Sequence, residues 1–194
     1  MTATPKTKRG EMTRQKILAA AQKEIGTKGF ALASVSSITA AAGVGQGTFY
    51  IYFKSKEEVL RALVIQLGRD VRHSLTAATE QASSRLEAER QGISAFLDFV
   101  RENKEMYKVV HEAQFVDPEI HRQYYTDFAE AYCERLKKAS SDGEIKSIDH
   151  EACAWALMGM SEFLGMRYGF WDDSKSSKKI ADAVFNMIET GLKK

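Results

Sequence analysis

Proline and cysteine are both scarce in this chain. Its 194 residues include two prolines and two cysteines. With so few helix-breaking residues, long stretches can remain helical, which favours helices over strands and turns. Cys133 and Cys153 are too few for a disulfide framework or a zinc site. Each lies in an apolar helical stretch, so we expect both to be core residues in a reducing compartment.

Long apolar runs are also missing. The longest, Ala152 to Met160, is too short to span a bilayer. The first ten residues, MTATPKTKRG, are basic, but no apolar stretch follows them as in a secretory signal peptide. We therefore expect a cytoplasmic protein with no membrane partner, whose residues 1–10 form a disordered basic arm.

Charge is distributed unevenly, although the total of +2 is close to neutral. Residues 1–60 contain nine Lys or Arg and four Glu, a net charge of +5, which leaves −3 for the remainder. A basic N-terminal part on a mildly acidic body is typical of a nucleic-acid-binding module joined to a separate domain. Small imbalances are also common in other proteins, so the charge alone does not decide the function.

Capping residues and helical periodicity predict four helices in the first eighty residues. Thr13 is expected to cap the first helix, and Gly29 to end it. Ser34 caps a short second helix, and the turn Gly43–Gly45 separates it from a short third helix. A capping box that begins at Ser55 starts a fourth helix, which we expect to run to about residue 80.

The rest of the chain continues the helical pattern. Asp117–Glu119 is a strong helix start, because Asp at the cap precedes Pro at the first helical position. Strand-like alternation and internal repeats are both missing from the sequence. We expect an all-α fold of about nine helices, with the later ones over 86–102, 104–115, 118–139, 150–170 and 176–192.

The most informative segment spans residues 29–56 and reads GFALASVSSITAAAGVGQGTFYIYFKSK. Two short helices joined by a glycine-containing turn form a unit that can place its second helix in the major groove of DNA. Phe49 and Phe53, four residues apart, would anchor that second helix to the core. The opposite face would then carry polar and aromatic side chains toward a partner.

These outward side chains have the chemistry of base and phosphate recognition. Gln46 can pair in a bidentate manner with adenine, and the methyl group of Thr48 can contact a thymine methyl. Nearby tyrosines and lysines can reach phosphates, and serines at the start of the preceding helix can hold one. The predicted DNA-binding residues are Ser34, Ser36, Gln46, Gly47, Thr48, Tyr50, Ile51, Tyr52, Lys54 and Lys56.

The segment resembles the N-terminal domain of the TetR (tetracycline-repressor-like) family. That pattern runs from Gly-aromatic and a Ser/Thr cap through Ala-Gly-Val and Gly-Thr-hydrophobic-Tyr to a Lys-Glu helix start. Thr39, Ser37 and Gly45 depart from it. Because Ser37 stands where an acid is common, the capping box of Ser34 is expected to be weak. The match extends over about 45 residues, at Gly29, Phe30, Ser34, Ile38, Ala42, Gly43, Val44, Gly47, Thr48, Phe49, Tyr50, Tyr52, Phe53, Lys56 and Glu57.

The resemblance implies a ligand-responsive transcriptional repressor. Residues 11–56 would be a helix-turn-helix DNA-binding domain, and residues 57–194 a ligand-binding and dimerisation domain. A homodimer would bind double-stranded operator DNA of pseudo-palindromic sequence. A small hydrophobic or amphipathic effector would release it.

In proteins of this family the last two helices pair with their copies in the partner chain. Small residues at Ala152, Ala156 and Gly159 would permit such close approach. The alternative is that this face packs within one chain. The predicted interface residues are Ala156, Gly159, Met160, Phe163, Arg167, Val184, Met187 and Ile188.

The middle helices are rich in aromatic and polar-tipped residues, as is typical of a ligand pocket in a helical bundle. Tyr107, His111 and Gln114 follow one another at one-turn spacing, so we expect them to reach a bound ligand together. Taken singly, each residue is more typical of packing or of the surface. The predicted ligand-binding residues are Tyr107, His111, Gln114, Phe115, Tyr125, Phe128, Trp155, Met158 and Phe163.

Catalytic and metal-binding patterns are missing from the sequence. It has no phosphate loop, and its Ser, His and Asp residues follow no recognisable arrangement. His111 and His121 lie ten residues apart across Pro118, with no third His nearby. We therefore expect no enzyme, no metal and no cofactor. The open alternatives are an activator or ligand-requiring regulator of the same fold, a helical enzyme or metal-binding bundle, and an interaction protein without DNA affinity.

Overall fold

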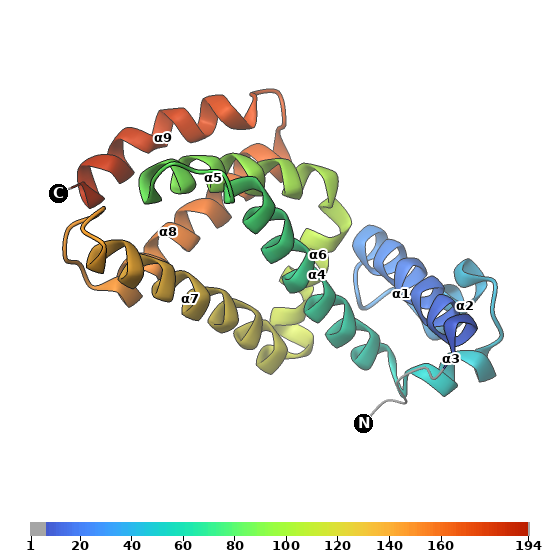
Figure 1. The fold of residues 1–194 in the computed structure, drawn as a ribbon. Helices are drawn as coiled ribbons and strands as arrows, with labels where there is room; N and C mark the ends of the chain where they lie inside the picture. The colour runs from blue at the N-terminus through green and yellow to red at the C-terminus, as the bar shows by residue number, and fades with distance from the viewer. Residues whose placement is uncertain (1–6, 194) are drawn as a thin grey trace. The chain divides into compact units, whose positions relative to one another are not determined.

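The computed structural model describes residues 7–193, and all of its regular elements are helices. No strand occurs in that range, so the predicted all-α fold is confirmed. The elements are α1 (Lys8–Lys28), α2 (Val35–Ala42), α3 (Gln46–Tyr52), α4 (Lys56–Thr79), α5 (Arg85–Glu102), α6 (Lys104–Val116), α7 (Pro118–Ser141), α8 (His150–Leu164), the π-helix η1 (Gly165–Trp171) and α9 (Ser177–Leu192) (Figure 1).

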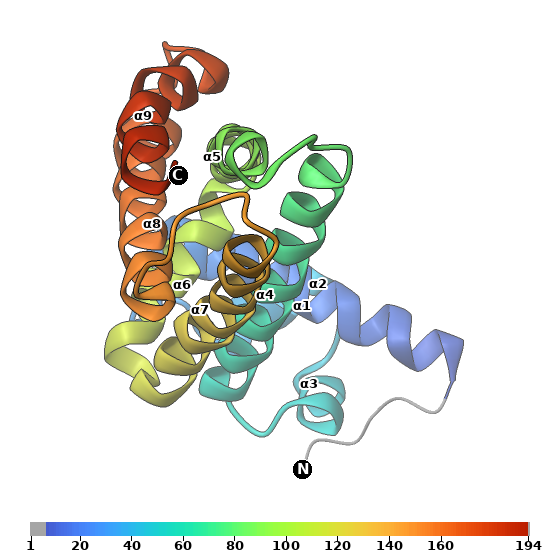
Figure 2. The same cartoon turned by 60° about the vertical axis from the view of Figure 1, so that its left-hand side comes forward.

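The helices pack into two compact units. The first takes residues up to Leu67 together with Lys104–Tyr124, and the second takes Gly68–Asn103 and the residues from Tyr125 on. Consequently α4 and α7 contribute to both units, and α6 belongs to the same unit as α1, α2 and α3. Figure 2 shows these helices from a second direction. The functional division expected between residues 56 and 57 stays a prediction, because compactness does not say which part binds which partner.

The first helix begins earlier than expected. Residues 1–6 of the predicted arm lie outside the described residues, but Lys8–Gly10 already form the first turn of α1. Thr7 is the N-cap in place of Thr13, since its side chain accepts a hydrogen bond at 3.1 Å from the backbone amide three residues later. The sequence pattern missed this start because apolar periodicity begins only at Ile17.

The cap of α2 is also stronger than expected. Ser34 Oγ accepts a hydrogen bond from the Ser37 amide at 3.0 Å, and Ser37 Oγ accepts one from the Ser34 amide at 3.1 Å. A serine therefore completes the capping box that normally uses an acid. At α4, Ser55 Oγ accepts from the Glu58 amide at 3.3 Å, whereas the Glu58 carboxylate accepts from the Lys54 amide at 2.5 Å.

The core of the first unit is aliphatic and aromatic. Its largest fully buried side chains include Ile17, Ile25, Ile38, Phe49 and Phe53. They come from α1, α2, α3 and the residue that ends α3, so one core holds all three N-terminal helices. Burial of each such side chain stabilises the fold by about 1.5–3 kcal/mol.

Helices α1 and α6 approach closely at Gly26. A Cβ on this glycine would lie 2.4 Å from Cβ of Glu105 and 2.8 Å from its Cα. Glycine is therefore required here by packing, and the approach joins α6 to the N-terminal helices.

The second unit is organised around α5. Buried residues of α5, α7, α8 and α9 form a single cluster, with Leu97 and Leu136 fully buried in it. Cys133 and Cys153 pack against this cluster and are half-buried free thiols, in agreement with their expected place in the core.

The predicted single helix over 150–170 is interrupted. It leaves the α-helical pattern after Leu164 and continues as η1, whose wider turns bring two glycines against α5. A Cβ at Gly165 would lie 2.8 Å from Cε1 of Phe96, and a Cβ at Gly169 would lie 2.8 Å from Cγ1 of Val100. The Arg101 guanidinium donates to the carbonyl of Tyr168 at 2.9 Å, so α5 also holds the last turn of η1.

A buried carboxylate inside the second unit is paired. Glu89 of α5 is 3% exposed and forms an ion pair with Arg85 at 2.6 Å. The hydroxyl of Tyr132 on α7 donates to the same carboxylate. Burial raises the pKa of Tyr132 well above its ordinary value, and the neighbouring Glu89 charge raises it further, so the phenol stays protonated as a donor.

We expect Gly26→Ala to lower the free energy of unfolding by about 1–3 kcal/mol, because its methyl group would overlap the backbone of α6. Gly191→Ala is the matched control, since a Cβ at Gly191 meets no atom within 4 Å. There the higher helix propensity of alanine should raise the free energy of unfolding by up to about 1 kcal/mol. Urea unfolding of both variants checks the prediction, and an equal response at the two glycines would contradict it.

Candidate nucleic-acid interface

A tight turn joins α2 to α3. Gly43 adopts a left-handed conformation (φ 66°), which favours glycine, and its amide donates to the carbonyl of Ala40 at 3.2 Å. The Val44 amide donates to the carbonyl of Thr39 at 3.0 Å. These bonds end α2, and α3 begins after a turn of three residues. This is the geometry of a helix-turn-helix.

The buried side of α3 is aromatic. Phe49 is 0% exposed and Phe53 is 1% exposed, with ring centroids 5.8 Å apart. The rings of Tyr50 and Phe49 meet edge to face, with their centroids 5.3 Å apart. This packing sets the rotation of α3 about its axis and thereby decides which side chains face outward.

The outer side of α3 brings together most of the residues predicted from the sequence. Tyr50 is 55% exposed and Ile51 is 64% exposed. Gln46, Gly47 and Lys54 are also exposed, whereas Thr48 and Tyr52 are half-buried.

Two glycines on this surface are not required by the fold. A Cβ at Gly45 or at Gly47 would meet no atom within 4 Å. Glycine inside a helix is less favourable than alanine by up to about 1 kcal/mol. Their presence leaves free space where another molecule can approach the backbone of α3.

Ser34 and Ser36, at the start of α2, are both exposed, as predicted. Ser34 Oγ is already the cap of α2, so its lone pair toward the Ser37 amide is occupied. The Ser36 hydroxyl makes none of the α2 capping bonds, and its side chain faces outward.

Lys56 corrects the sequence interpretation. Its ammonium donates to the carbonyls of Phe30 at 2.6 Å and Ala33 at 2.7 Å, and it lies 4.1 Å from the centroid of the Phe30 ring. The side chain therefore binds the α1–α2 loop to the start of α4, and is not extended toward a phosphate. Sequence reasoning missed this role because the partners lie far away along the chain.

Arg14 is a residue that the sequence did not single out. It is half-buried on α1, and its guanidinium lies 5.3 Å from the centroid of the Phe53 ring. A cation is thus held beside the end of α3. No local pattern separates Arg14 from the other basic residues of α1.

The residues predicted to bind a ligand are divided between the two units. Tyr107 and His111 lie together in the first unit, with ring centroids 4.6 Å apart, while Gln114 is exposed. In the second unit Tyr125, Phe128 and Met158 are half-buried. That Tyr107, His111 and Gln114 reach one ligand together stays a prediction.

Three predicted ligand residues are too exposed for an enclosed site. Phe115 is 83% exposed, Phe163 69% and Trp155 44%. On α8, the buried residues Ala154 and Leu157 lie on the opposite side of the helix from Trp155 and Phe163, as the 3.6-residue period requires. The sequence could not tell which aromatic stripe faces inward.

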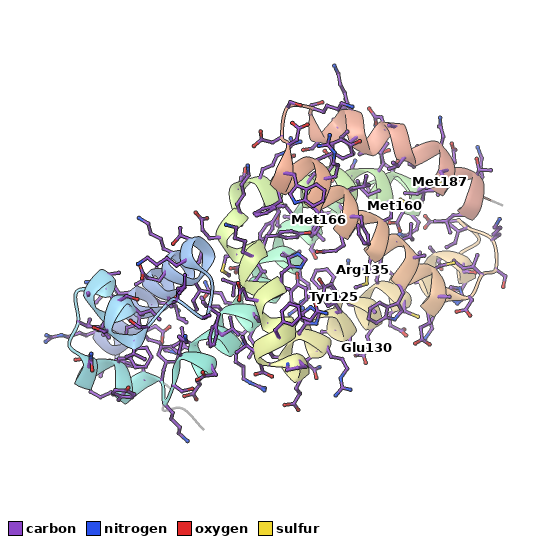
Figure 3. All side chains as sticks on the ribbon, turned by 180° about the vertical axis from the view of Figure 1, so that it is seen from behind. Tyr125, Glu130, Arg135, Met160, Met166 and Met187 are labelled. Atoms are coloured by element: carbon purple, nitrogen blue, oxygen red, sulfur yellow. The ribbon has the colours of Figure 1, made fainter. Side chains whose placement is uncertain are left out.

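The predicted dimer residues are divided between the surface and the core. Ala156, Phe163, Arg167 and Met187 are exposed, and Gly159, Met160 and Val184 are half-buried. Figure 3 shows Met160 on α8 and Met187 on α9 from the side on which both are visible. Ile188 is 4% exposed and belongs to the core of the second unit, so assigning it to an interface was wrong.

Within residues 7–193, no group of three or more His, Cys, Asp or Glu side chains is arranged to hold a metal ion. None of the helices described is both long and apolar enough to cross a membrane.

The comparisons with known proteins agree with the geometry of α2 and α3. The family of bacterial regulatory proteins called the tetR family matches residues 17–63. The uncharacterized HTH-type transcriptional regulator YdgC of Bacillus subtilis is 31% identical over 193 residues, covering 95% of this chain and 94% of YdgC. The HTH-type transcriptional regulator EthR of Mycolicibacterium smegmatis is 36% identical over 103 residues, or 50% of this chain and 48% of EthR.

Solved structures share the whole fold. The fatty acid degradation regulator FadR from Bacillus halodurans has a TM-score of 0.81 at 19% identity, covering 95% of this chain and 96% of that one. FadR from Bacillus subtilis, solved in complex with stearoyl-CoA, has a TM-score of 0.79 at 19% identity, covering 92% and 98%. This chain belongs to the TetR family of helix-turn-helix, DNA-binding transcriptional regulators.

Removing the charge of Lys54 should affect DNA binding, whereas removing the charge of Lys56 should affect stability. We expect Lys54→Gln to reduce the salt dependence of binding to a mixed-sequence duplex by roughly one unit of slope, with unchanged stability. Lys56→Gln should instead lower the free energy of unfolding by about 1–2 kcal/mol, because two carbonyls lose a charged donor. Fluorescence anisotropy titrations at several salt concentrations and urea unfolding measure the two effects. A loss of stability in Lys54→Gln, with unchanged stability in Lys56→Gln, would contradict the structure.

Proposed function

We propose that the protein is a ligand-responsive repressor that binds a pseudo-palindromic operator as a homodimer. The observation that supports this most strongly is the outward face of α3, where Tyr50 and Ile51 are exposed while Phe49 and Phe53 are buried. A helix-turn-helix places its second helix, here the seven-residue α3, in the major groove, where exposed side chains of that helix can contact base edges.

The proposed contacts divide into base readout and phosphate binding. Gln46, Thr48 and Ile51 would contact base edges, with the apolar groups against thymine methyls. The neighbouring polar and basic side chains would bind phosphates and set the register of the protein on the duplex. That second group comprises Ser34, Ser36, Tyr50, Tyr52 and Lys54, with Arg14 added and Lys56 reassigned to positioning the α1–α2 loop.

The dimer is supported by one apolar stripe along α8. Ala152, Trp155, Ala156, Gly159 and Phe163 follow helical spacing, and all but the half-buried Gly159 are exposed. A Cβ at Gly159 would meet no atom of the chain within 4 Å, so the chain's own packing gives no reason for glycine there. A helix of a second copy crossing at Gly159 would supply that reason.

The effector would bind in the second unit. Tyr125, Phe128 and Met158 are half-buried there and offer apolar surface, as ligand sites in helical bundles do. The complex of the Bacillus subtilis FadR with stearoyl-CoA, a protein of the same fold, favours an elongated amphipathic effector. Release from the operator would follow if the effector binds more tightly to a conformation that mismatches the operator.

The test is selection of bound sequences from a random duplex pool at physiological salt. A pseudo-palindrome should be enriched, with half-sites about 34–36 Å apart or more. Tyr50→Ala should abolish the enrichment, whereas Phe115→Ala, which removes an exposed aromatic ring from α6, should preserve it. Enrichment that requires added cell extract would identify a regulator that needs its ligand to bind. The proposal is wrong if no sequence is enriched under either condition.

The dimer can be tested separately. We expect Phe163→Glu to convert the dimer to a monomer, since a carboxylate would be buried against an apolar surface of the second copy. Phe115→Glu introduces the same charge at a still more exposed ring on α6 and should leave the dimer intact. Sedimentation velocity measures the mass of each variant. A Phe163→Glu dimer as tight as the wild type would exclude this part of α8 from the interface.

A further inference from the structure

Arg72 differs from the other half-buried arginines of the second unit in the partners of its guanidinium. It lies on α4 and is half-buried, next to Val71, which is 1% exposed. Its guanidinium lies 5.6 Å from the centroid of the Phe128 ring on α7. No side-chain or backbone oxygen among residues 7–193 forms a hydrogen bond or an ion pair with it.

The comparison within the unit shows how unusual this is. The guanidinium of Arg85 is held by Glu89 at 2.6 Å, and that of Arg90 by Glu87 and Asp182, each at 2.8 Å. The guanidinium of Arg101 is held by the carbonyls of Tyr168 and Lys175. Each of these cations, withdrawn in part from water, is compensated by protein oxygens, as burial of charge requires.

The carboxylate that meets the adjoining turn of α7 is that of Glu89 on α5, and it is already engaged. Tyr132 follows Phe128 by one helical turn, and its hydroxyl donates to Glu89. That carboxylate also pairs with Arg85, so it has its partners without Arg72. Contact with an aromatic ring engages the charge of a guanidinium but gives its five N–H donors no oxygen acceptor.

We propose that Arg72, which lies over the Phe128 ring, binds the anionic headgroup of an amphipathic effector. The fork of N–H donors fits a carboxylate or a phosphate in a bidentate manner, and the aromatic ring supplies apolar contact to the adjoining part of the ligand. The inference rests on the proposed function, since it names the chemical class of the effector. It also places the polar contact of the effector on α4, the helix that begins beside the α1–α2 loop at Lys56.

Four ten-carbon probes that differ only in the headgroup test the proposal: decanoate, decyl phosphate, decanol and decyltrimethylammonium. Isothermal titration calorimetry of the full chain below the micelle concentration measures each Kd. We expect at least one of the two anions to bind about tenfold or more tightly than the alcohol and the cation, as charged hydrogen bonds to a guanidinium require. Whichever anion binds more tightly distinguishes a carboxylate effector from a phosphate effector.

Variants on the same helix provide the control. Arg72→Gln should remove the preference for the anion, whereas Arg69→Gln, an exposed arginine on α4, should retain it. Arg72→Lys preserves the charge and should retain only part of the preference, so the proposal stays testable if the glutamine variant does not fold. Equal affinity for all four probes, no binding of either anion, or an Arg72→Gln protein that keeps the preference would each overturn the proposal.

The proposed repression is tested separately, with the duplex selected above. An anion that binds through Arg72 but leaves the protein on that duplex would support the anion site and contradict release by this class of effector. Failure of the duplex selection, with the anion preference intact, would contradict DNA repression alone.

Discussion

The burial of Phe49 and Phe53 is the interaction on which the DNA-binding surface depends. Both rings pack into the core that α1 and α2 also share, so α3 cannot rotate without exposing them. Each ring buries enough area for its removal to destabilise the unit by about 3–5 kcal/mol. The exposed position of Tyr50 and Ile51 is a consequence of that burial, since neighbouring residues on one helix must face different directions.

The helical glycines of this chain are of two kinds: those that close packing requires, and those that packing within the chain does not explain. At Gly26 and Gly169 a Cβ would overlap atoms of the same chain, so close helix packing demands glycine. At Gly47 and Gly159 a Cβ would meet nothing within 4 Å, although alanine would suit a helix better. We place DNA at Gly47 and the second copy at Gly159, whereas Gly191, which also has open space, serves as the stability control.

Local signals made much of the fold predictable from the sequence. Gly29, Ser34 and the turn at Gly43 act on residues within one helical turn of themselves, so helix ends could be found there. The start of α1 was missed because Thr7 precedes any apolar periodicity. The change from α8 to η1 depends on Gly165 packing against Phe96, a contact that no local pattern contains.

The site was predictable to a similar degree and for the same reason. The exposed set on α3 follows from the spacing of two phenylalanines. The role of Lys56 depends on the carbonyls of Phe30 and Ala33, and Trp155 could be assigned to the surface only after the buried side of α8 was known. Arg72 could be singled out only in the structure, because the other half-buried arginines of its unit are paired with protein oxygens.

Methylation interference on the selected duplex tests the central claim most directly, namely that α3 reads the major groove. Dimethyl sulfate marks N7 of guanine in the major groove and N3 of adenine in the minor groove, two edges that a protein reads separately. A dimer of this fold should be blocked by N7 methylation in two major grooves on one face of the duplex, about one helical turn apart or more. Interference confined to adenine N3, or spread without any period, would contradict the assignment of α3 as the recognition helix.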